Sequence, residues 1–441
     1  MKKNTIIITG TAIFFFLFCF PFFAMSAGKN VITINPFLRK MPIAVPHFKS
    51  VPDNAELSEN CAAILSDTLE FTGYFKILKQ AAFPDSPHIT GKIDSVADFG
   101  QWTAIGADYL ITGGIKTNGK LFEMELRLFD TVKQTMLIGK RYKGWTVDRE
   151  KTIRRFCSEV IHHLTGSWGF FDSRIAFVSN GTGNKEIYTC DFNGKSIKKF
   201  TTHKSITLTP SWSSDAKWLA YTSYAKGNPD IYIKKLRDKY GSVFSRNGTN
   251  ATPAWVPGKF MLAASLSFSG DQDIYLLTGK GKLGKRLTRK WGIDTSPAFS
   301  PDGTKMAFVS SRAGSPQIYI YDMRSGKVER LTFDGRYNTQ PDWSPKGNEI
   351  VYSALNRSRI DICVIGVNGR NMRKLTRNSG KNESPSWAPD GSMIVFSSNR
   401  EGPNRIYIMT AFGTDQRRLL VLPGQQSSPA WSPRLVQKIS D

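Results

Sequence analysis

Cysteine and histidine are scarce in this sequence, with five of each among 441 residues, and no two cysteines form a CxxC pair. A disulfide framework and a zinc site are therefore both excluded, and we expect the cysteines of the mature chain to be buried thiols that act as small apolar side chains. These cysteines are Cys61, Cys157, Cys190 and Cys363. The pair His162–His163 is poorly placed to share a metal, because neighbouring residues of a helix point about 100° apart. We predict no metal and no cofactor.

Acidic residues are also in short supply. The chain has 36 Asp and Glu against 60 Lys and Arg, which gives a formal net charge of +24. With only 22% charged residues of both signs, the composition excludes a disordered chain. The positive charge favours acidic partners, which include nucleic acid, an anionic envelope surface or an acidic protein. Composition alone does not choose among the three.

A long apolar run occurs only once, from Ile6 to Phe23, after the positive charges of Lys2 and Lys3. Small residues follow at Ser26 and Ala27, which is the layout of a secretory signal peptide over residues 1–26. An uncleaved membrane anchor is the alternative. No later stretch approaches the roughly 20 apolar residues of a spanning helix, so we expect the mature chain to be soluble and exported.

The second part of the chain is built from repeats. A Pro-x-Trp or Pro-x-Phe element recurs at intervals of 43 or 44 residues, and an Ile-Tyr pair and a Leu-Thr pair keep the same period in most repeats. The prolines are Pro210, Pro253, Pro297, Pro341, Pro385 and Pro429. Each period reads as four short strands between turn residues, which is the size of one blade of a β-propeller.

The two ends of the repeat region are complementary. The first repeat, starting at Arg174, lacks a Pro-x-Trp strand before it, and the last Pro-x-Trp strand, ending near Pro433, has no blade after it. We predict that this C-terminal strand completes the first blade, with Trp431 beside Ile175, and closes a six-bladed ring without exposed edges. An open solenoid of six repeats is the competing fold, but it needs capping repeats that the sequence lacks.

The residues before the repeats show a different pattern, in which helices and strands both occur. A buried strand at Ile43–Val45 precedes an amphipathic helix that starts after Asp53 or Asn54 and ends at Gly73. A short helix near 99–105 leads into strands at 109–112, 122–129 and about 136–142, and a closing helix carries apolar residues from Ile153 to Leu164. The fold class is thus mainly β with an α/β part, namely a small N-terminal α/β domain followed by the propeller.

Two kinds of chemistry are disfavoured. Gly279, Gly281 and Gly284 match G-x-G-x-x-G, but they lie in a blade hairpin with no helix after them, so a dinucleotide site is not expected. A secreted propeller hydrolase needs a G-x-S-x-G elbow, which is missing, and a domain larger than the region outside the ring. A hydrolase or a carbohydrate-binding module stays open as the alternative function.

Small polar residues precede each repeat proline, at the expected mouth of the channel. Cations stand shortly before these residues in the chain, at Arg246, Arg289, Lys290, Arg336, Arg377 and Lys381. A polar cup with a cationic rim suits an acidic protein or peptide. Nucleic acid is not expected, because the Trp residues recur at core positions and do not alternate with basic residues on a free face. The candidate binding residues are Thr209, Asn250, Thr252, Asp294, Thr295, Asn338, Thr339, Asn382, Glu383, Gln426 and Ser427.

The sequence resembles the TolB family of periplasmic propeller proteins of the Tol–Pal envelope system. The resemblance rests on Pro42–Phe48, Gly106–Gly113, Leu126–Asp130 and the six Pro-x-Trp or Pro-x-Phe repeats, and it covers nearly the whole mature chain. It implies a non-enzymatic adaptor in the periplasm that acts in outer-membrane integrity and in constriction at cell division. The implied partners are a Pal-like peptidoglycan-associated lipoprotein at the channel, a TolA-like inner-membrane protein and other outer-membrane proteins, with the adaptor itself monomeric.

The resemblance also implies a mobile N-terminal segment at residues 27–40, in which Val31, Ile32 and Ile34 bind the TolA-like protein by adding a strand. The predicted layout is then a signal peptide over 1–26, this segment, the α/β domain over 41–166, the propeller over 171–433 and a C-terminal tail over 434–441. The chain departs from the repeat pattern at Ser214, Val256 and Cys363.

Overall fold

The computed structural model describes residues 40–51, 54–84 and 99–435. The predicted signal peptide, the segment with Val31, Ile32 and Ile34, and the last six residues of the tail lie outside this part. Within the described ranges, no helix has the length and apolar character needed to cross a bilayer.

The N-terminal domain contains one mixed sheet with the strand order β3-β1-β4-β5-β6, and β2 pairs with β4. β1 is parallel to β3 and β4, whereas β4, β5 and β6 form an antiparallel meander. The strands are β1 (Met41–Ala44), β2 (Lys49–Val51), β3 (Phe75–Ile77), β4 (Tyr109–Asn118), β5 (Leu121–Asp130) and β6 (Thr135–Trp145). The short strands β2 and β3 were not predicted, because three residues are too few to show a period.

Three α-helices flank this sheet, and they confirm the predicted helices. α1 (Ala55–Phe71) begins after Asn54, whose side chain accepts a hydrogen bond from the Leu57 backbone N–H at 2.9 Å. α2 is Phe99–Ala104, and α3 (Arg149–Thr165) ends at Gly166, which adopts a left-handed φ of 76°. Two 3₁₀ turns, η1 (Gln80–Ala82) and η2 (Thr146–Asp148), complete the domain.

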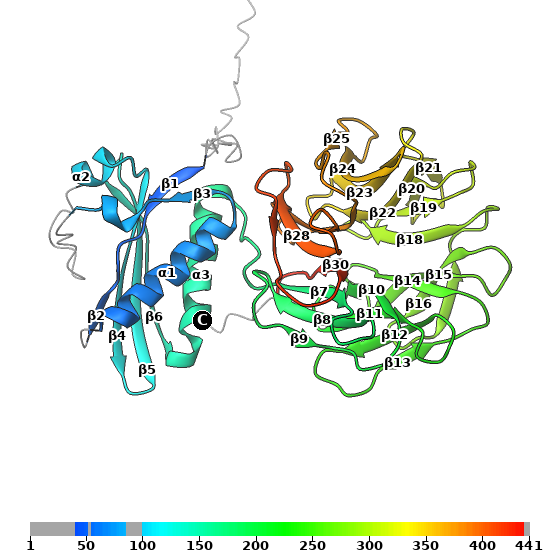
Figure 1. Cartoon of the computed structure of the whole chain (residues 1–441), viewed down its shortest axis with the longest axis horizontal. Helices are drawn as coiled ribbons and strands as arrows, with labels where there is room; N and C mark the ends of the chain where they lie inside the picture. The colour runs from blue at the N-terminus through cyan, green and yellow to red at the C-terminus, as the bar shows by residue number, and fades with distance from the viewer. Residues whose placement is uncertain (1–39, 52–53, 85–98, 436–441) are drawn as a thin grey trace, which may run out of the picture. The chain divides into compact units, whose positions relative to one another are not determined.

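Alternate residues of the strands bury the two faces of the sheet. α1 and α3 lie side by side on one face, where Leu65 and Phe156 pack with Ile111 (Figure 1). On the other face, Trp102 of α2 packs with Leu110. Neighbouring residues of β4 therefore serve opposite cores, as the period of two along a strand requires.

The repeats form six four-stranded antiparallel blades, which follow one another around a ring (Figure 1). Blade 1 contains β30 (Gln426–Trp431), β7 (Arg174–Ser179), β8 (Glu186–Asp191) and β9 (Lys198–Lys199). Blade 2 contains β10 (Thr207–Trp212), β11 (Trp218–Ser223), β12 (Asp230–Lys235) and β13 (Ser242–Phe244). Blade 3 contains β14 (Asn250–Trp255), β15 (Met261–Leu266), β16 (Asp273–Thr278) and β17 (Leu283–Arg286).

The other three blades repeat this order. Blade 4 contains β18 (Asp294–Phe299), β19 (Lys305–Ser310), β20 (Gln317–Asp322) and β21 (Val328–Arg330). Blade 5 contains β22 (Tyr337–Trp343), β23 (Glu349–Asn356), β24 (Arg359–Gly366) and β25 (Arg373–Lys374). Blade 6 contains β26 (Asn382–Trp387), β27 (Met393–Ser398), β28 (Arg405–Thr410) and β29 (Arg417–Arg418).

The C-terminal strand closes the ring as predicted. β30 pairs with β7, and Trp431 lies opposite Ile175. The Trp431 side chain is 6% exposed, its indole N–H donates to Ser173 Oγ at 2.8 Å, and its ring meets that of Phe170 edge to face. One blade is thus built from both ends of the repeat region, so the inner edge of β7 is paired rather than open.

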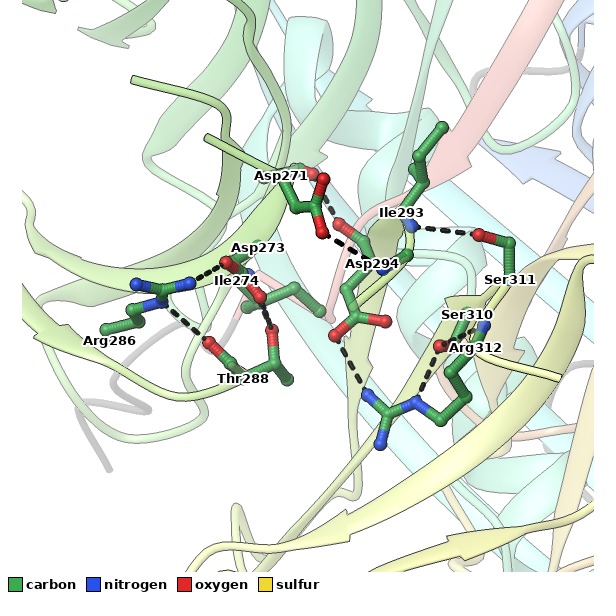
Figure 2. A network of polar contacts seen from close by, with 12 residues as sticks. Asp271, Asp273, Ile274, Arg286, Thr288, Ile293, Asp294, Ser310, Ser311 and Arg312 are labelled. Atoms are coloured by element: carbon green, nitrogen blue, oxygen red, sulfur yellow. Dashed lines mark hydrogen bonds and ion pairs between the residues drawn. The ribbon is translucent and has the colours of Figure 1, made fainter. Parts of the chain in front are cut away.

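The sequence markers with the 44-residue period meet inside the blades. In blade 3, the Thr288 hydroxyl donates to the Asp273 carboxylate at 3.2 Å and accepts the Ile274 backbone N–H at 2.9 Å (Figure 2). We call this pair of hydrogen bonds the threonine clasp. The same clasp joins Thr332 with Gln317 in blade 4 and Thr376 with Asp361 in blade 5. The Leu-Thr pair and the residue before Ile-Tyr therefore recur together because their side chains bond to each other.

We predict that the Trp431→Ala substitution destabilises the propeller by roughly 3–5 kcal/mol, because it removes a buried indole at the closure of the ring. The thermal unfolding midpoint measures the effect. Trp291→Ala is the matched control, since Trp291 is 76% exposed. Equal midpoints for the two variants would contradict the importance of this closure.

Loss of one threonine clasp should destabilise the propeller less than loss of the Trp431 indole. Thr288→Val keeps the side-chain shape but leaves the Asp273 carboxylate and the Ile274 N–H without their shared hydroxyl, at a cost of about 1–3 kcal/mol. Urea unfolding compares this variant with Thr202→Val, where the side chain is exposed. A Thr288→Val protein as stable as its control would show that the clasp contributes nothing.

Candidate functional site

The innermost strand of every blade carries the same backbone irregularity. The register of the strand shifts between the second residue before the repeat proline and the residue after it, as at Leu208/Ser211 and Thr339/Asp342. The residue directly before the proline has a left-handed φ in all six strands, with values from 48° to 54°. These residues are Thr209, Thr252, Ser296, Gln340, Ser384 and Ser428.

The bulge explains the repeat proline. Proline has no N–H to donate, so it fits the point where the ladder is interrupted. A non-glycine residue in the left-handed region costs on the order of 1–3 kcal/mol and persists only where the surroundings hold it in place. Because six such residues recur around one axis, the bulge is a regular structural feature of the channel.

The six bulges line a cavity of about 370 Å³ on the axis of the propeller. We number the inner-strand positions from the residue three before the repeat proline, so that the bulge residue is position 3, the proline position 4 and the next residue position 5. Positions 3 to 5 of all six strands contribute to the wall of the cavity. Because the chain returns to the axis once per repeat, residues 44 positions apart in the sequence become neighbours.

Polar contacts join the wall from blade to blade. The Thr252 hydroxyl accepts the Ser296 backbone N–H at 3.2 Å, and the Gln340 side-chain carbonyl accepts the Ser384 backbone N–H at 2.8 Å. In each case a position 3 side chain holds the position 3 backbone of the next blade. These bonds fix the position 3 backbone of blades 4 and 6, and the wall still presents hydroxyl and amide groups to the cavity.

The predicted binding residues divide by position. At position 3, Thr209 and Thr252 line the cavity as expected. At position 2, the predicted residues are half-buried beside it, and the Thr295 hydroxyl lies 3.2 Å from that of Thr252. The other position 2 residues are Thr339, Glu383 and Ser427.

At position 1, the predicted residues are completely buried inside the blades. They are Asn250, Asp294, Asn338, Asn382 and Gln426. Asp294 pairs with Arg312 at 2.9 Å (Figure 2), and the Asn338 amide donates to the Gln317 side chain at 2.7 Å. These side chains bond within and between the blades, and their complete burial keeps them out of reach of a partner in this structure.

The position 3 residues of blades 4, 5, 6 and 1 line the cavity but were not among the candidates. They are Ser296, Gln340, Ser384 and Ser428. The sequence contained the signal that identifies them, because they stand 44 residues apart in the same place as Thr252. The sequence placed these residues at the channel mouth with the other residues before the prolines. It could not show that position 3 faces the axis, because the bulge changes which residue does so and a bulge is not visible in the period.

The loops that lead into the inner strands carry the cations as predicted. Arg246, Arg289, Lys290, Arg336, Arg377 and Lys381 are all exposed. The same loops also expose large apolar side chains, which the sequence analysis did not single out. Trp291 is 76%, Phe333 70% and Val421 84% exposed. Exposed large apolar residues among charged ones are typical of protein-binding surfaces.

Titratable groups are almost absent from the cavity. Asp342 is the single ionisable residue among those that line it. The acid–base pair that hydrolysis requires is thus missing from the described lining. In the part of the chain that the structure describes, no three His, Cys, Asp or Glu side chains gather as metal ligands.

The glycines and cysteines considered in the sequence lie at structural positions. Gly279 and Gly281 lie in the hairpin between β16 and β17, where no helix follows. The four cysteines of the described part are free and buried, and desolvation raises the pKa of the Cys363 thiol to about 11.

Comparisons with known proteins agree with this architecture. Residues 161–435 match the TolB beta propeller domain, and residues 31–137 match the TolB amino-terminal domain. A Tol-Pal system protein TolB from Desulfosudis oleivorans is 54% identical over 279 residues, which cover 63% of this chain and 64% of that protein. A TolB homolog from Chlorobium luteolum is 37% identical over 66% of this chain and 67% of its own length.

A solved structure is also similar. The crystal structure of TolB from Acinetobacter baumannii superimposes with a TM-score of 0.79 and 28% identity, covering 90% of this chain and 97% of that chain. The sequence match to the Desulfosudis relative spans less than two thirds of that protein. The structural match to the Acinetobacter protein spans nearly the whole length of both chains. With both domain types present in order, the chain belongs to the TolB family.

Proposed function

We propose that this protein is a non-enzymatic periplasmic adaptor of the Tol–Pal system, whose propeller channel binds a Pal-like peptidoglycan-associated lipoprotein. The observation that carries the proposal is the channel itself, with six bulged strands that present polar groups around one cavity. Relatives bear the name Tol-Pal system protein, which supports the choice of system. The adaptor acts in outer-membrane integrity and in constriction at cell division.

The loops at the channel mouth suit a protein partner with an acidic surface. Exposed cations attract it over a distance of about 10 Å at moderate ionic strength. Exposed Trp291, Ile293 and Phe333 then offer apolar area that a docked partner buries. Charge thus favours the encounter, while apolar contact and the polar wall hold the complex.

A second contact is part of the proposal. A TolA-like protein binds through the N-terminal segment, with Val31, Ile32 and Ile34 adding as a strand to that partner. This element rests on the family resemblance, because the segment lies outside the described residues. Truncation of residues 27–34 in the mature protein should abolish TolA-like binding and leave binding of the Pal-like lipoprotein intact.

Photo-crosslinking tests the channel. A photoreactive residue at Thr252 or Ser296 in whole cells should capture one envelope lipoprotein, identified by mass spectrometry. Lys198, exposed on the outer strand β9, is the matched control and should not capture it. Equal capture from Lys198, or no envelope protein from either channel position, would contradict the proposal.

Charge reversal tests the rim. The double variant R336E/R377E should weaken binding of the Pal-like partner by about tenfold or more at low salt, because it replaces attraction by repulsion. The difference should shrink as salt rises from about 0.05 to about 0.5 M, since screening removes both effects. K198E/K199E makes the same charge change at the outer edge of blade 1, and its affinity should equal that of the unmodified protein. A salt-independent affinity would argue against electrostatic attraction at the rim.

A further inference from the structure

One carboxylate stands in a cavity whose other lining residues are neutral. Asp342 occupies position 5 of blade 5, and the other five blades have Ser or Ala there. Those residues are Ser211, Ala254, Ala298, Ser386 and Ala430. Asp342 is half-buried and lines the cavity, so the channel has one negative point although the chain carries a net charge of +24.

The fold does not require this charge. The Asp342 carboxylate accepts the Trp387 backbone N–H of the next blade at 2.7 Å. One blade further on, the neutral Ser386 hydroxyl accepts the Trp431 backbone N–H at 3.1 Å in the same way. A hydroxyl therefore suffices for the blade-to-blade bond, and the negative charge of Asp342 is not needed for it.

No cation of the described chain neutralises Asp342. The groups that act on it are the backbone N–H groups of Trp343 and Trp387 and the Ser386 hydroxyl, none of which carries a charge. Ala298 and Phe299 line the cavity on the side of blade 4. Burial raises the pKa of the Asp342 carboxyl to about 6, although these hydrogen bonds oppose the shift. A desolvated carboxylate without a counter-ion is poised to gain one.

We propose that Asp342 is a subsite for the guanidinium or ammonium group of a basic side chain that the partner inserts into the channel. This inference rests on the proposed function, since it names a feature of the partner that the channel selects. The rim cations attract an acidic surface, whereas Asp342 accepts one positive group at the centre. A partner that is acidic throughout would place like charges together in the cavity. The rim cations and Asp342 together therefore discriminate between such a partner and one that has an acidic surface and one inserted basic group.

A small probe tests the subsite without any partner. N-acetyl-arginine amide carries the guanidinium, and N-acetyl-citrulline amide has the same shape without the charge. In amide NMR spectra of the mature protein with EDTA present, the arginine probe should shift the Ser384 and Trp387 signals and the citrulline probe should not. Asp342→Ser should abolish the response, because Ser keeps the blade contact and removes the charge.

Ser211→Ala is the matched control. Ser211 occupies position 5 of blade 2 and lines the same cavity, but it is not among the groups that act on Asp342, so the response of this variant to the arginine probe should equal that of the unmodified protein. Equal responses to the two probes, or an unchanged response in Asp342→Ser, would overturn the subsite. Thermal unfolding of each variant verifies that the ring remains closed.

The pH dependence has a defined sign. Below the pKa of Asp342 the carboxyl is neutral, so the arginine probe should bind more weakly at about pH 5 than at about pH 7.5. Asp342→Ser should show no such difference. Stronger binding at the lower pH would contradict the proposal.

The soluble domain of the Pal-like lipoprotein supplies the partner measurement. Asp342→Ser should raise its Kd by about tenfold or more, because the inserted basic group loses its counter-charge. An unchanged Kd would overturn the inference while the adaptor function stands. If the unmodified protein does not bind this domain, the adaptor proposal fails, and the arginine probe still decides whether Asp342 holds a cation.

Discussion

The antiparallel pairing of β30 with β7 is the contact on which the molecule depends. It joins residues from the two ends of the repeat region, with Trp431 opposite Ile175. Without it, the first blade lacks its inner strand and the ring has two open edges. All other features of the channel require six inner strands around one cavity, and only a closed ring provides them.

Within the closed ring, side-chain bonds from neighbouring blades stabilise the strained backbone of the inner strands. Each inner strand holds one non-glycine residue in a left-handed conformation, next to a proline that does not pair. Side chains of the neighbouring blade hold this geometry, as Thr252 does for Ser296. Further out, the threonine clasps fix the strands whose loops lead to the channel mouth. The cavity is consequently shaped in the absence of a partner, which would lower the entropic cost of the proposed binding.

Charge is distributed by depth in this protein. Exposed loops carry the cations of the rim, the wall of the cavity offers neutral hydroxyl and amide groups, and Asp342 stands alone among them. Solvent screens the rim charges, so they act mainly on encounter, whereas a carboxylate in a desolvated cavity interacts strongly with a single counter-charge. In the proposed complex, such a surface would select a partner by the pattern of its charges rather than by their sum.

The sequence alone determined the propeller, its six blades and the way it closes, because a 44-residue period in three markers leaves few other folds. It also determined α1 and α3, whose apolar stripes and caps are local features. Only the tertiary structure decided which residues face the channel: Asp294 and Asn338 were expected at the mouth but are buried, while Ser296 and Gln340 line the wall. The physical reason is the bulge, which reverses the alternation of faces within a strand and depends on contacts between blades rather than on neighbours in the sequence.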